Sequence, residues 1–349
     1  MHGEYKVSGG KLVVIDVEVD NGTLRDVSVS GDFFLEPAAA LEAINASLDG
    51  LSASSDPETF TDAVRGALPP DAVLTGFSPA AVTVALSRAL GQATDWSEYD
   101  WQLIHGPVLT TAQNVALDEV LSQQVAAGKR LPTLRLWEWD DRAVVIGSFQ
   151  SLRNEVNMPE ARRHDVEIVR RISGGGAMFM EGGNCITYSL YLPAELVAGL
   201  SFVDAYSFLD DWVLAALAEI GVKAWYVPIN DITSEHGKIG GAAQKRFGSG
   251  TVLHHVTMSY DIDADKMTDV LRVGKEKMSD KGHTSAKKRV DPLRRQTGMS
   301  RADIIDVMIA TFKNRYGLTT SAITDEELAL ADERVAAKFA APEWLERVP

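Results

Sequence analysis

Apolar and polar side chains alternate from residue 11 to residue 33, and Asp20-Asn21-Gly22 interrupts the alternation. A period of two is typical of a strand with one buried face, and Asn-Gly readily adopts the positive φ values of a tight turn. The pattern therefore predicts a β-hairpin. Apolar positions then recur every three or four residues after Pro37 and at about 57–67 and 79–91, which predicts three helices.

A polar stretch without periodicity, residues 92–100, marks the predicted boundary between two domains, 1–92 and 100–349. Beyond it, helices and strands alternate loosely rather than in regular strand–helix–strand units, which favours an α+β fold over a doubly wound sheet. Helices are predicted at 110–127, at 202–220 and in the C-terminal part, and strands at about 133–138, 143–147, 167–172, 185–192, 222–227, 237–244 and 250–260.

The composition narrows the class of protein. With 45% hydrophobic and 24% charged residues, the 349-residue chain can bury a sizeable core, so extended disorder is not expected. The net charge of −15 repels phosphate backbones, and nucleic acid is therefore not an expected partner. A single cysteine, no apolar leader and no apolar run long enough to span a bilayer favour a cytoplasmic protein that is not in a membrane.

A glycine-rich turn carries the densest chemical signal. The segment from Arg170 to Phe179 reads Arg-Arg-Ile-Ser-Gly-Gly-Gly-Ala-Met-Phe and follows a predicted strand. Three successive glycines lose much conformational entropy on folding, and close approach of the backbone to a ligand is one reason for them. Successive N–H groups beside a guanidinium suit a phosphate or an acyl-phosphate. The alternative is a plain turn with surface arginines, and the spacing matches neither a P-loop nor a dinucleotide-binding turn.

Lys238 stands among small residues in the predicted strand 237–244, shortly after Asn230-Asp231. Small neighbours leave room for a ligand against the backbone, and an ammonium group there can stabilise charge as an adenylate forms. A solvated hairpin lysine is the alternative. On the next predicted strand, His254 and His255 are adjacent and face opposite sides, so they cannot both line one pocket. Structural or supporting roles are expected for this pair.

A basic segment and the single cysteine are the remaining candidates for functional groups. Residues 271–299 hold nine basic and three acidic residues, a local charge of +6 in an acidic chain. Such an island indicates an anionic partner, such as a nucleotide or an acidic protein domain, or else a solvated basic face. Gly274, Gly282 and Gly298 would let part of it move as a lid. Cys185 is interpreted as a buried structural thiol, because no base can be assigned to activate it.

In this order the segments resemble the lipoate–protein ligases over about residues 101–300. The matching motifs are Arg-Arg-x-Ser-Gly-Gly-Gly-Ala (170–177), Gly-Asn (183–184), Asn-Asp (230–231), Gly-Lys-Ile-x-Gly (237–241), His-His-x-Thr (254–257), and Lys-Gly-x-x-Ser with Arg-Val (281–290). Residues 1–92 also resemble the small accessory domain of these ligases, placed here before the catalytic domain instead of after it.

The resemblance implies a catalytic domain like those of biotin ligases and class II tRNA synthetases, with a mixed or antiparallel sheet and flanking helices. It implies a ligase that uses ATP and Mg²⁺ to convert lipoate, or octanoate, into an acyl-adenylate. The acyl group then passes to a lysine of an acceptor domain of the 2-oxoacid dehydrogenase or glycine cleavage type.

The resemblance also assigns roles by position. Lys238 is the implied catalytic residue, and residues 271–290 resemble the loop that closes over the adenylate. The implied nucleotide contacts are Arg171, Gly176, Ala177, Met178, Phe179 and Lys238. The implied contacts to lipoate or the adenylate are Arg170, Gly174, Gly175, Asn184, Asp231 and Lys238. No metal ligand can be assigned, and Asp231 is only a candidate for holding Mg²⁺.

Two other functions are compatible with the sequence. An octanoyltransferase of the same fold moves an acyl group through a cysteine without ATP, but residues 224–235, where close relatives carry that cysteine, contain none. A non-catalytic lipoyl-binding module is the second, whereas a biotin ligase would need a Gly-Arg-Gly-Arg loop that is missing. Met180, Gly240 and Val256 depart from the ligase pattern, and these departures bear on acyl-chain preference more than on adenylation.

Overall fold

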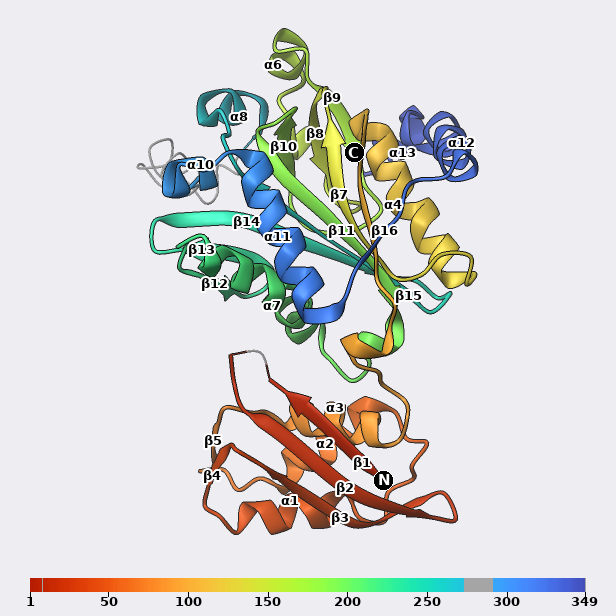
Figure 1. Ribbon diagram of the computed structural model, residues 1–349, viewed down its shortest axis with the longest axis vertical. Helices are drawn as coiled ribbons and strands as arrows, with labels where there is room; N and C mark the ends of the chain where they lie inside the picture. Colours follow the sequence, from red (N-terminus) through yellow and green to blue (C-terminus); the bar gives the residue numbers. More distant parts are fainter. Residues whose placement is uncertain (8, 273–290, 349) are drawn as a thin grey trace. The chain divides into compact units, whose positions relative to one another are not determined.

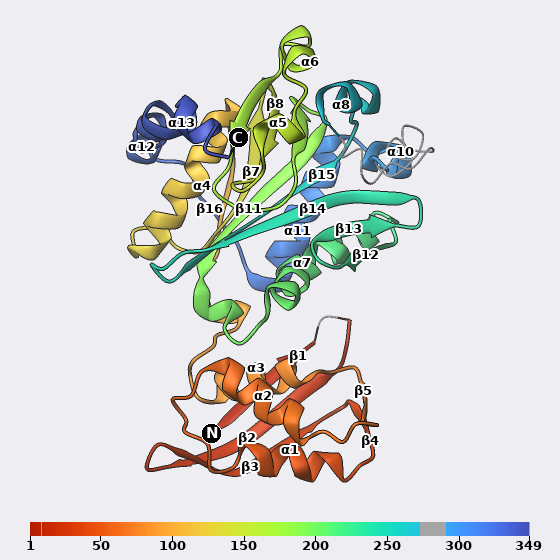
Figure 2. The same ribbon diagram turned by 180° about the vertical axis from the view of Figure 1, so that it is seen from behind.

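The computed structural model describes residues 1–7, 9–272 and 291–348, which form two compact units (Figures 1 and 2). The first comprises Met1–Glu98 and Ala194–Asp211, and the second comprises Tyr99–Pro193 and Trp212–Pro349. The sequence pattern assigns residues 100–349 to the second domain. The segment 194–211 differs because it packs into the first core, where the Phe208 ring lies 6.1 Å from that of Tyr5 and 5.6 Å from that of Trp96.

The first unit is a three-stranded antiparallel sheet with helices packed against it. Its elements are β1 (His2–Lys6), β2 (Leu12–Asp20), β3 (Thr23–Gly31), β4 (Phe34–Glu36), α1 (Ala40–Leu48), α2 (Pro57–Ala67), β5 (Val73–Thr75), α3 (Pro79–Ala89), the 3₁₀ turns η1 (Trp96–Glu98) and η2 (Ala194–Val197), and the start of α7 (Phe202–Glu219). Asn21 and Gly22 turn between β2 and β3 with φ values of 51° and 76°, so the predicted hairpin is confirmed.

The second unit contains most of the chain and two sheets. Its elements are β6 (Gln102–Leu109), α4 (Thr111–Ala126), β7 (Thr133–Trp139), β8 (Arg142–Ile146), α5 (Leu152–Glu155), α6 (Met158–Arg163), β9 (Glu167–Arg170), β10 (Met178–Glu181), β11 (Cys185–Pro193), the end of α7, β12 (Ala224–Val227), β13 (Asp231–Ser234), β14 (Gly237–Arg246), β15 (Thr251–Ser259), α8 (Ala264–Val270), α10 (Leu293–Thr297), α11 (Arg301–Tyr316), β16 (Thr319–Thr320), α12 (Asp325–Arg334), the π-helical turn η4 (Val335–Phe339) and α13 (Pro342–Leu345).

The large sheet has the strand order β12-β13-β14-β15-β11-β7-β6-β16, and a smaller sheet has the order β10-β8-β9. Strand β6 pairs in parallel with β7 and β16, and β8 pairs in parallel with β9, while the other neighbours are antiparallel. The predicted α+β class with a mixed sheet and flanking helices is confirmed. Both predicted central helices and the predicted strands occur within two residues of their expected bounds, whereas β6, β10, β13 and β16 were not predicted. Among the described residues no helix is long and apolar enough to cross a bilayer.

Helices cover both faces of the large sheet: α4 lies on one face, and α11 with the end of α7 on the other (Figures 1 and 2). Strand β11 contributes alternate side chains to the two faces. Tyr188 stacks edge-on against Trp212 of α7, with ring centroids 5.0 Å apart. Its neighbour Ser189, and Tyr191 beyond, instead donate hydrogen bonds to Asp118 of α4. The face covered by α4 therefore carries polar groups, and the candidate site lies on this side.

Candidate active site

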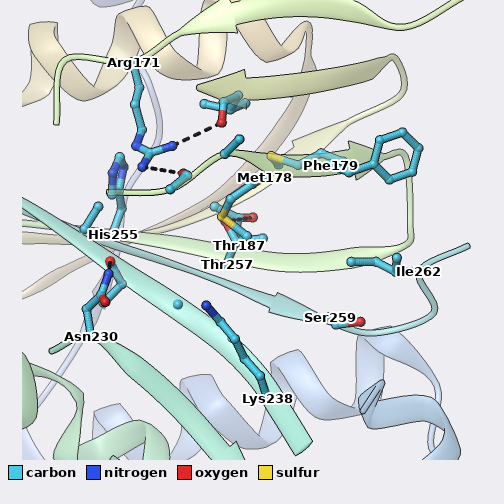
Figure 3. A pocket seen from close by; sticks show the side chains of 18 of the residues that line it. Arg171, Met178, Phe179, Thr187, Asn230, Lys238, His255, Thr257, Ser259 and Ile262 are labelled. Carbon is cyan, nitrogen blue, oxygen red and sulfur yellow. Dashed lines mark hydrogen bonds between the residues drawn. The ribbon is translucent and has the colours of Figure 1, made fainter. Parts of the chain in front are cut away.

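A cavity of about 210 Å³ lies in the second unit, with walls from both sheets (Figure 3). His255, Thr257 and Ser259 of β15 line it, whereas His254, Val256 and Met258, which alternate with them along the strand, do not. This alternation follows from the period of a strand and confirms that the two histidines cannot share one pocket. It also places Val256, one of the departures from the ligase pattern, outside the cavity wall.

The glycine loop forms one wall of this cavity. Gly176 lines it, and so do the next residues Ala177, Met178 and Phe179. The carbonyl oxygens of Gly174 and Gly176 accept hydrogen bonds from Nη2 of Arg171 at 2.5 and 2.9 Å. By contrast, the N–H groups of all three glycines from 174 to 176 have no hydrogen-bond acceptor among the described residues. Arg171 thus holds the loop by its carbonyls and leaves successive amides available to an anion.

The two adjacent arginines have different roles. Arg171 lines the cavity, and its Nε also donates to Ser173 Oγ at 3.0 Å. Arg170 is fully buried on the opposite side and donates to the carbonyl oxygens of Gly147 and Leu345 at 2.9 and 2.6 Å. The structure therefore does not bring Arg170 to the cavity, and the ligand contact expected of it is replaced by a structural role.

Asn184 is also placed away from the cavity. Its Oδ1 accepts a hydrogen bond from the Glu181 N–H at 2.8 Å, and its carbonyl oxygen accepts from the N–H groups of Tyr260 and Asp261, both at 2.9 Å. The side chain closes the turn between β10 and β11, and the backbone joins that turn to the end of β15. Asn184 therefore shapes the turn beside the site and does not line the cavity.

Lys238 enters the cavity from β14, on the side opposite Arg171, and its ammonium group points toward the centre (Figure 3). Its Nζ lies 2.7 Å from Oδ1 of Asp231, a residue that does not itself line the cavity. Both side chains are more than one-third exposed, and such a pair contributes at most about 1 kcal/mol. A substrate oxygen can therefore replace Asp231 at low energetic cost.

The two glycines near Lys238, Gly240 and Gly241, are required for different steric reasons. A Cβ on Gly240 would lie 2.7 Å from the carbonyl oxygen of Thr257 on the neighbouring strand, so this departure from the ligase pattern permits close strand packing. A Cβ on Gly241 would lie 3.2 Å from Lys238 Nζ and would crowd the ammonium group. The expectation that small neighbours make room at the lysine is therefore met at Gly241.

Among the residues that the structure describes, the cavity wall offers no carboxylate ligand for Mg²⁺. The carboxylate of Asp231 is already paired with Lys238, and no Asp or Glu is found among the described residues that line the cavity. Mg²⁺ prefers oxygen ligands, usually carboxylates together with water and substrate phosphates. The described residues of the wall therefore do not fit a metal ion held by the protein at this position.

A network of buried, hydrogen-bonded side chains supports the cavity and was not predicted from the sequence. Asp118 Oδ2 lies 2.7 Å from Nδ1 of His255, and Nε2 of His255 lies 2.7 Å from Ser173 Oγ. The other oxygen of Asp118 accepts from Ser189 and Tyr191 at 2.8 and 2.7 Å. Burial lowers the pKa of His255, against the opposing effect of its hydrogen bond to Asp118. The sequence signal was an acidic side chain on the apolar face of the helix predicted at 110–127.

The remaining wall of the cavity is largely apolar. Its apolar side chains are Trp137, Val145, Met178, Met180, Ile262, Met267 and Leu271. Figure 3 shows Ile262 on the side away from Arg171 and His255. Met180, which replaces the histidine frequent in the ligase pattern, is buried in this wall. The cavity therefore combines cationic and amide groups with an apolar surface that suits an acyl chain.

The cysteine and the basic segment contribute little to the described site. Cys185 is fully buried outside the cavity wall, and burial raises the pKa of its thiol, which confirms the structural interpretation. Of the basic residues between 271 and 299, the structure describes Arg272, Arg294 and Arg295. The remaining basic residues and nearly all of the lid expected at 271–290 lie outside the described residues.

Comparisons with known proteins match this chain to lipoate-protein ligases and octanoyltransferases. The sequence profile of the lipoyl protein ligase A/B catalytic domain matches residues 110–313. The octanoyltransferase LipM of Brevibacillus brevis is 27% identical over 278 residues, which cover 70% of this chain and 98% of its own. The probable lipoate-protein ligase A of Mycoplasma pneumoniae is 29% identical over 243 residues, which cover 68% of this chain and 70% of its own.

Solved structures show the same fold. The bi-partite lipoate protein ligase of Thermoplasma acidophilum, described with its E2 lipoyl domain, has a TM-score of 0.63 and 26% identity over 72% of this chain and 97% of its own. A lipoate-protein ligase A bound with ATP has a TM-score of 0.61 and 24% identity over 72% of this chain and 99% of its own. The matched profile begins at residue 110, so the likeness of residues 1–92 to an accessory domain stays a prediction.

Proposed function

Because the chain belongs to the lipoyl protein ligase A/B catalytic domain family, we propose that it activates lipoate, or octanoate, with ATP and transfers the acyl group to a lysine of an acceptor protein. One observation carries the adenylate-forming step: Gly176, the last of three successive glycines whose amides have no acceptors among the described residues, lines a cavity that Lys238 also lines, whereas Gly174 and Gly175 lie in the same loop outside the cavity wall. Amides and an ammonium group around one space suit the phosphates of a nucleotide and the carboxylate that attacks them.

The site supplies what an acyl-adenylate reaction requires. An oxygen of the acyl carboxylate attacks the α-phosphorus of ATP, an acyl–phosphate bond forms, and the bond to pyrophosphate breaks. The loop amides and Lys238 donate to oxygens that gain negative charge in this step. The unprotonated amine of the acceptor lysine then attacks the acyl carbonyl, AMP leaves, and the amine gives up a proton. The apolar wall holds the acyl chain and excludes water from the reactive intermediate.

A cysteine-dependent octanoyltransferase is the main alternative, since relatives such as LipM of Brevibacillus brevis are named octanoyltransferases. Such an enzyme needs an accessible thiolate near the acyl group. The only cysteine of the chain, Cys185, has a raised pKa and lies in the core outside the cavity wall. The burial of this thiol supports the ligase over the transferase.

The acceptor is proposed to be a lipoyl domain of a 2-oxoacid dehydrogenase or of glycine cleavage type. The ligase from Thermoplasma acidophilum is described together with an E2 lipoyl domain, which supports a partner of this kind. The acceptor lysine has to reach the acyl carbonyl beside Lys238. The cytoplasmic location expected from the sequence stays a prediction.

The decisive experiment supplies the full chain with ATP, Mg²⁺ and either lipoate or octanoate, and measures ATP–pyrophosphate exchange and the mass of a lipoyl acceptor domain. We expect exchange that depends on the acid, a mass increase of one acyl group, and unchanged activity in Cys185→Ala. Acylation from an octanoyl carrier protein without ATP, abolished in Cys185→Ala, would establish the transferase instead. Binding of lipoate without exchange or acyl transfer would establish a binding module.

A further inference from the structure

We propose that His255, held by Asp118, is a positioning residue whose unprotonated Nε2 fixes the Ser173 hydroxyl and, through it, the Arg171 guanidinium that shapes the glycine loop. The inference rests on the proposed ligase function for its activity tests, whereas the hydrogen-bond arrangement itself can be measured independently. It assigns a defined protonation state and tautomer to a buried histidine beside the anion-binding amides.

The proton positions follow from the donors and acceptors present. Ser189 and Tyr191 donate to one oxygen of Asp118, and its other oxygen lies 2.7 Å from Nδ1 of His255. A carboxylate can only accept, so the ring proton is on Nδ1 and Nε2 carries a lone pair. The Ser173 hydroxyl therefore donates to Nε2 over 2.7 Å.

The chain of hydrogen bonds ends on Arg171. Because the Ser173 proton is directed at His255, its oxygen lone pair is free to accept from Nε of Arg171 at 3.0 Å. The same guanidinium then holds the carbonyls of Gly174 and Gly176, which sets the orientation of the intervening amides. His255 is thus linked to the loop amides through two side chains.

Protonation of His255 would reverse one link of this chain. Nε2 would become a donor, and the Ser173 oxygen would face donors from both His255 and Arg171 and would have to redirect its own proton. A second positive charge would also arise beside Arg171 in a buried group. Burial already lowers the pKa of His255, which keeps the ring neutral near pH 7.

Among the described residues, four charged or titratable groups act on His255 or line the same cavity. Asp118 faces it from α4, Arg171 faces it from the loop after β9, and His254 precedes it on β15. Lys238 lines the same cavity from β14. Of these, Asp118 favours the charged ring and Arg171 and His254 oppose it. The fall in activity toward acid pH is therefore expected to follow a single group that titrates below the ordinary histidine pKa.

The tautomer is measured by two-bond ¹H–¹⁵N NMR on the full chain labelled at its seven histidines, with His255→Gln used for assignment. We expect His255 to carry its proton on Nδ1 at pH 7.5, and to lose this preference in Asp118→Asn. A proton on Nε2 in the wild-type chain, or an imidazolium at pH 7.5, would overturn the proposal. This measurement does not depend on any catalytic activity.

The activity test compares three variants in ATP–pyrophosphate exchange. His255→Leu removes both hydrogen bonds, and its kcat is expected to fall on the order of 10²-fold, as small misplacements of reacting groups do. His255→Gln keeps a donor for Asp118 and an acceptor for Ser173, so it should retain most of the wild-type rate and lose the acid limb of the pH profile. His254→Gln is the matched control on the opposite face of the same strand, and its pH profile should match that of the wild type.

The outcomes separate the two proposals. A wild-type rate in His255→Leu, or an unchanged acid limb in His255→Gln, would refute the positioning role. If His255→Leu does not fold, the glutamine variant decides through its pH profile. Absence of exchange in the wild-type chain would refute the ligase function alone, because the tautomer measurement still tests the hydrogen-bond chain.

Discussion

Replacing Lys238 with alanine separates a chemical role from a structural one. The ammonium group is 2.7 Å from Asp231, and the two side chains are 45% and 37% exposed. Solvent screening limits such a pair to about 1 kcal/mol or less, so the free energy of unfolding should change by no more than this. Loss of a donor to charge that develops in a transition state instead costs about 10²–10³-fold in rate. We therefore expect a folded protein with almost no adenylate formation.

The assay is ATP–pyrophosphate exchange with lipoate, combined with urea unfolding of the same samples. Lys245→Ala is the matched control, since Lys245 lies on the same strand, outside the cavity wall and over the Phe247 ring at 5.4 Å. Gly241→Ala perturbs the ammonium group without removing it, because the added Cβ would lie 3.2 Å from Nζ, and it should give an intermediate loss. A wild-type exchange rate in Lys238→Ala would show that the assignment is wrong.

Three further predictions test other parts of the site. Gly175→Ala places a Cβ 2.8 Å from Nη2 of Arg171 at a φ of +87°, so it should lower the free energy of unfolding by about 1–2 kcal/mol. It should also weaken ATP binding, measured by calorimetry, and an unchanged affinity would contradict the role of the loop. Arg170→Met removes a fully buried guanidinium that donates to the carbonyl oxygens of Gly147, Gln150 and Leu345, so the free energy of unfolding should fall by about 3 kcal/mol or more while kcat of the folded fraction persists. Lost kcat at wild-type stability would indicate a ligand contact instead. Because the pKa of His255 is lowered in the folded state, the unfolded chain binds more protons below about pH 6.5, and the free energy of unfolding should fall as the pH drops through this range. Urea unfolding at several pH values should show a shallower dependence on pH in His255→Gln.

Local patterns were sufficient for much of the fold. Asn21-Gly22 permitted only a tight turn between its flanking runs, and the helix and strand periods placed most central elements within two residues. Strand β6 was missed because Gly106-Pro107 interrupts its alternation. Strand β10 was missed because it is only four residues long and lies between the glycine loop and the next turn. These elements exist because of their partners in the sheet, which a local pattern does not contain.

The site was predictable in its motifs and not in its supporting contacts. The glycine loop and Lys238 were identified as separate segments, and the structure brings them to one cavity. Which of Arg170 and Arg171 faces that cavity depends on strand pairing and could not be derived from two adjacent identical residues. Asp118 and His255 are 137 positions apart, so their contact exists only in the tertiary structure.

The two sides of the cavity are built with different tolerance for change. The polar side depends on buried donors and acceptors that must be altered together, because any one of them left alone is costly. The opposite wall includes the thioethers of Met178, Met180 and Met267, which are unbranched and adapt to new shapes. Redesign or natural drift toward longer, shorter or bulkier acyl groups can therefore proceed through these methionines while the hydrogen-bonded polar side stays unchanged.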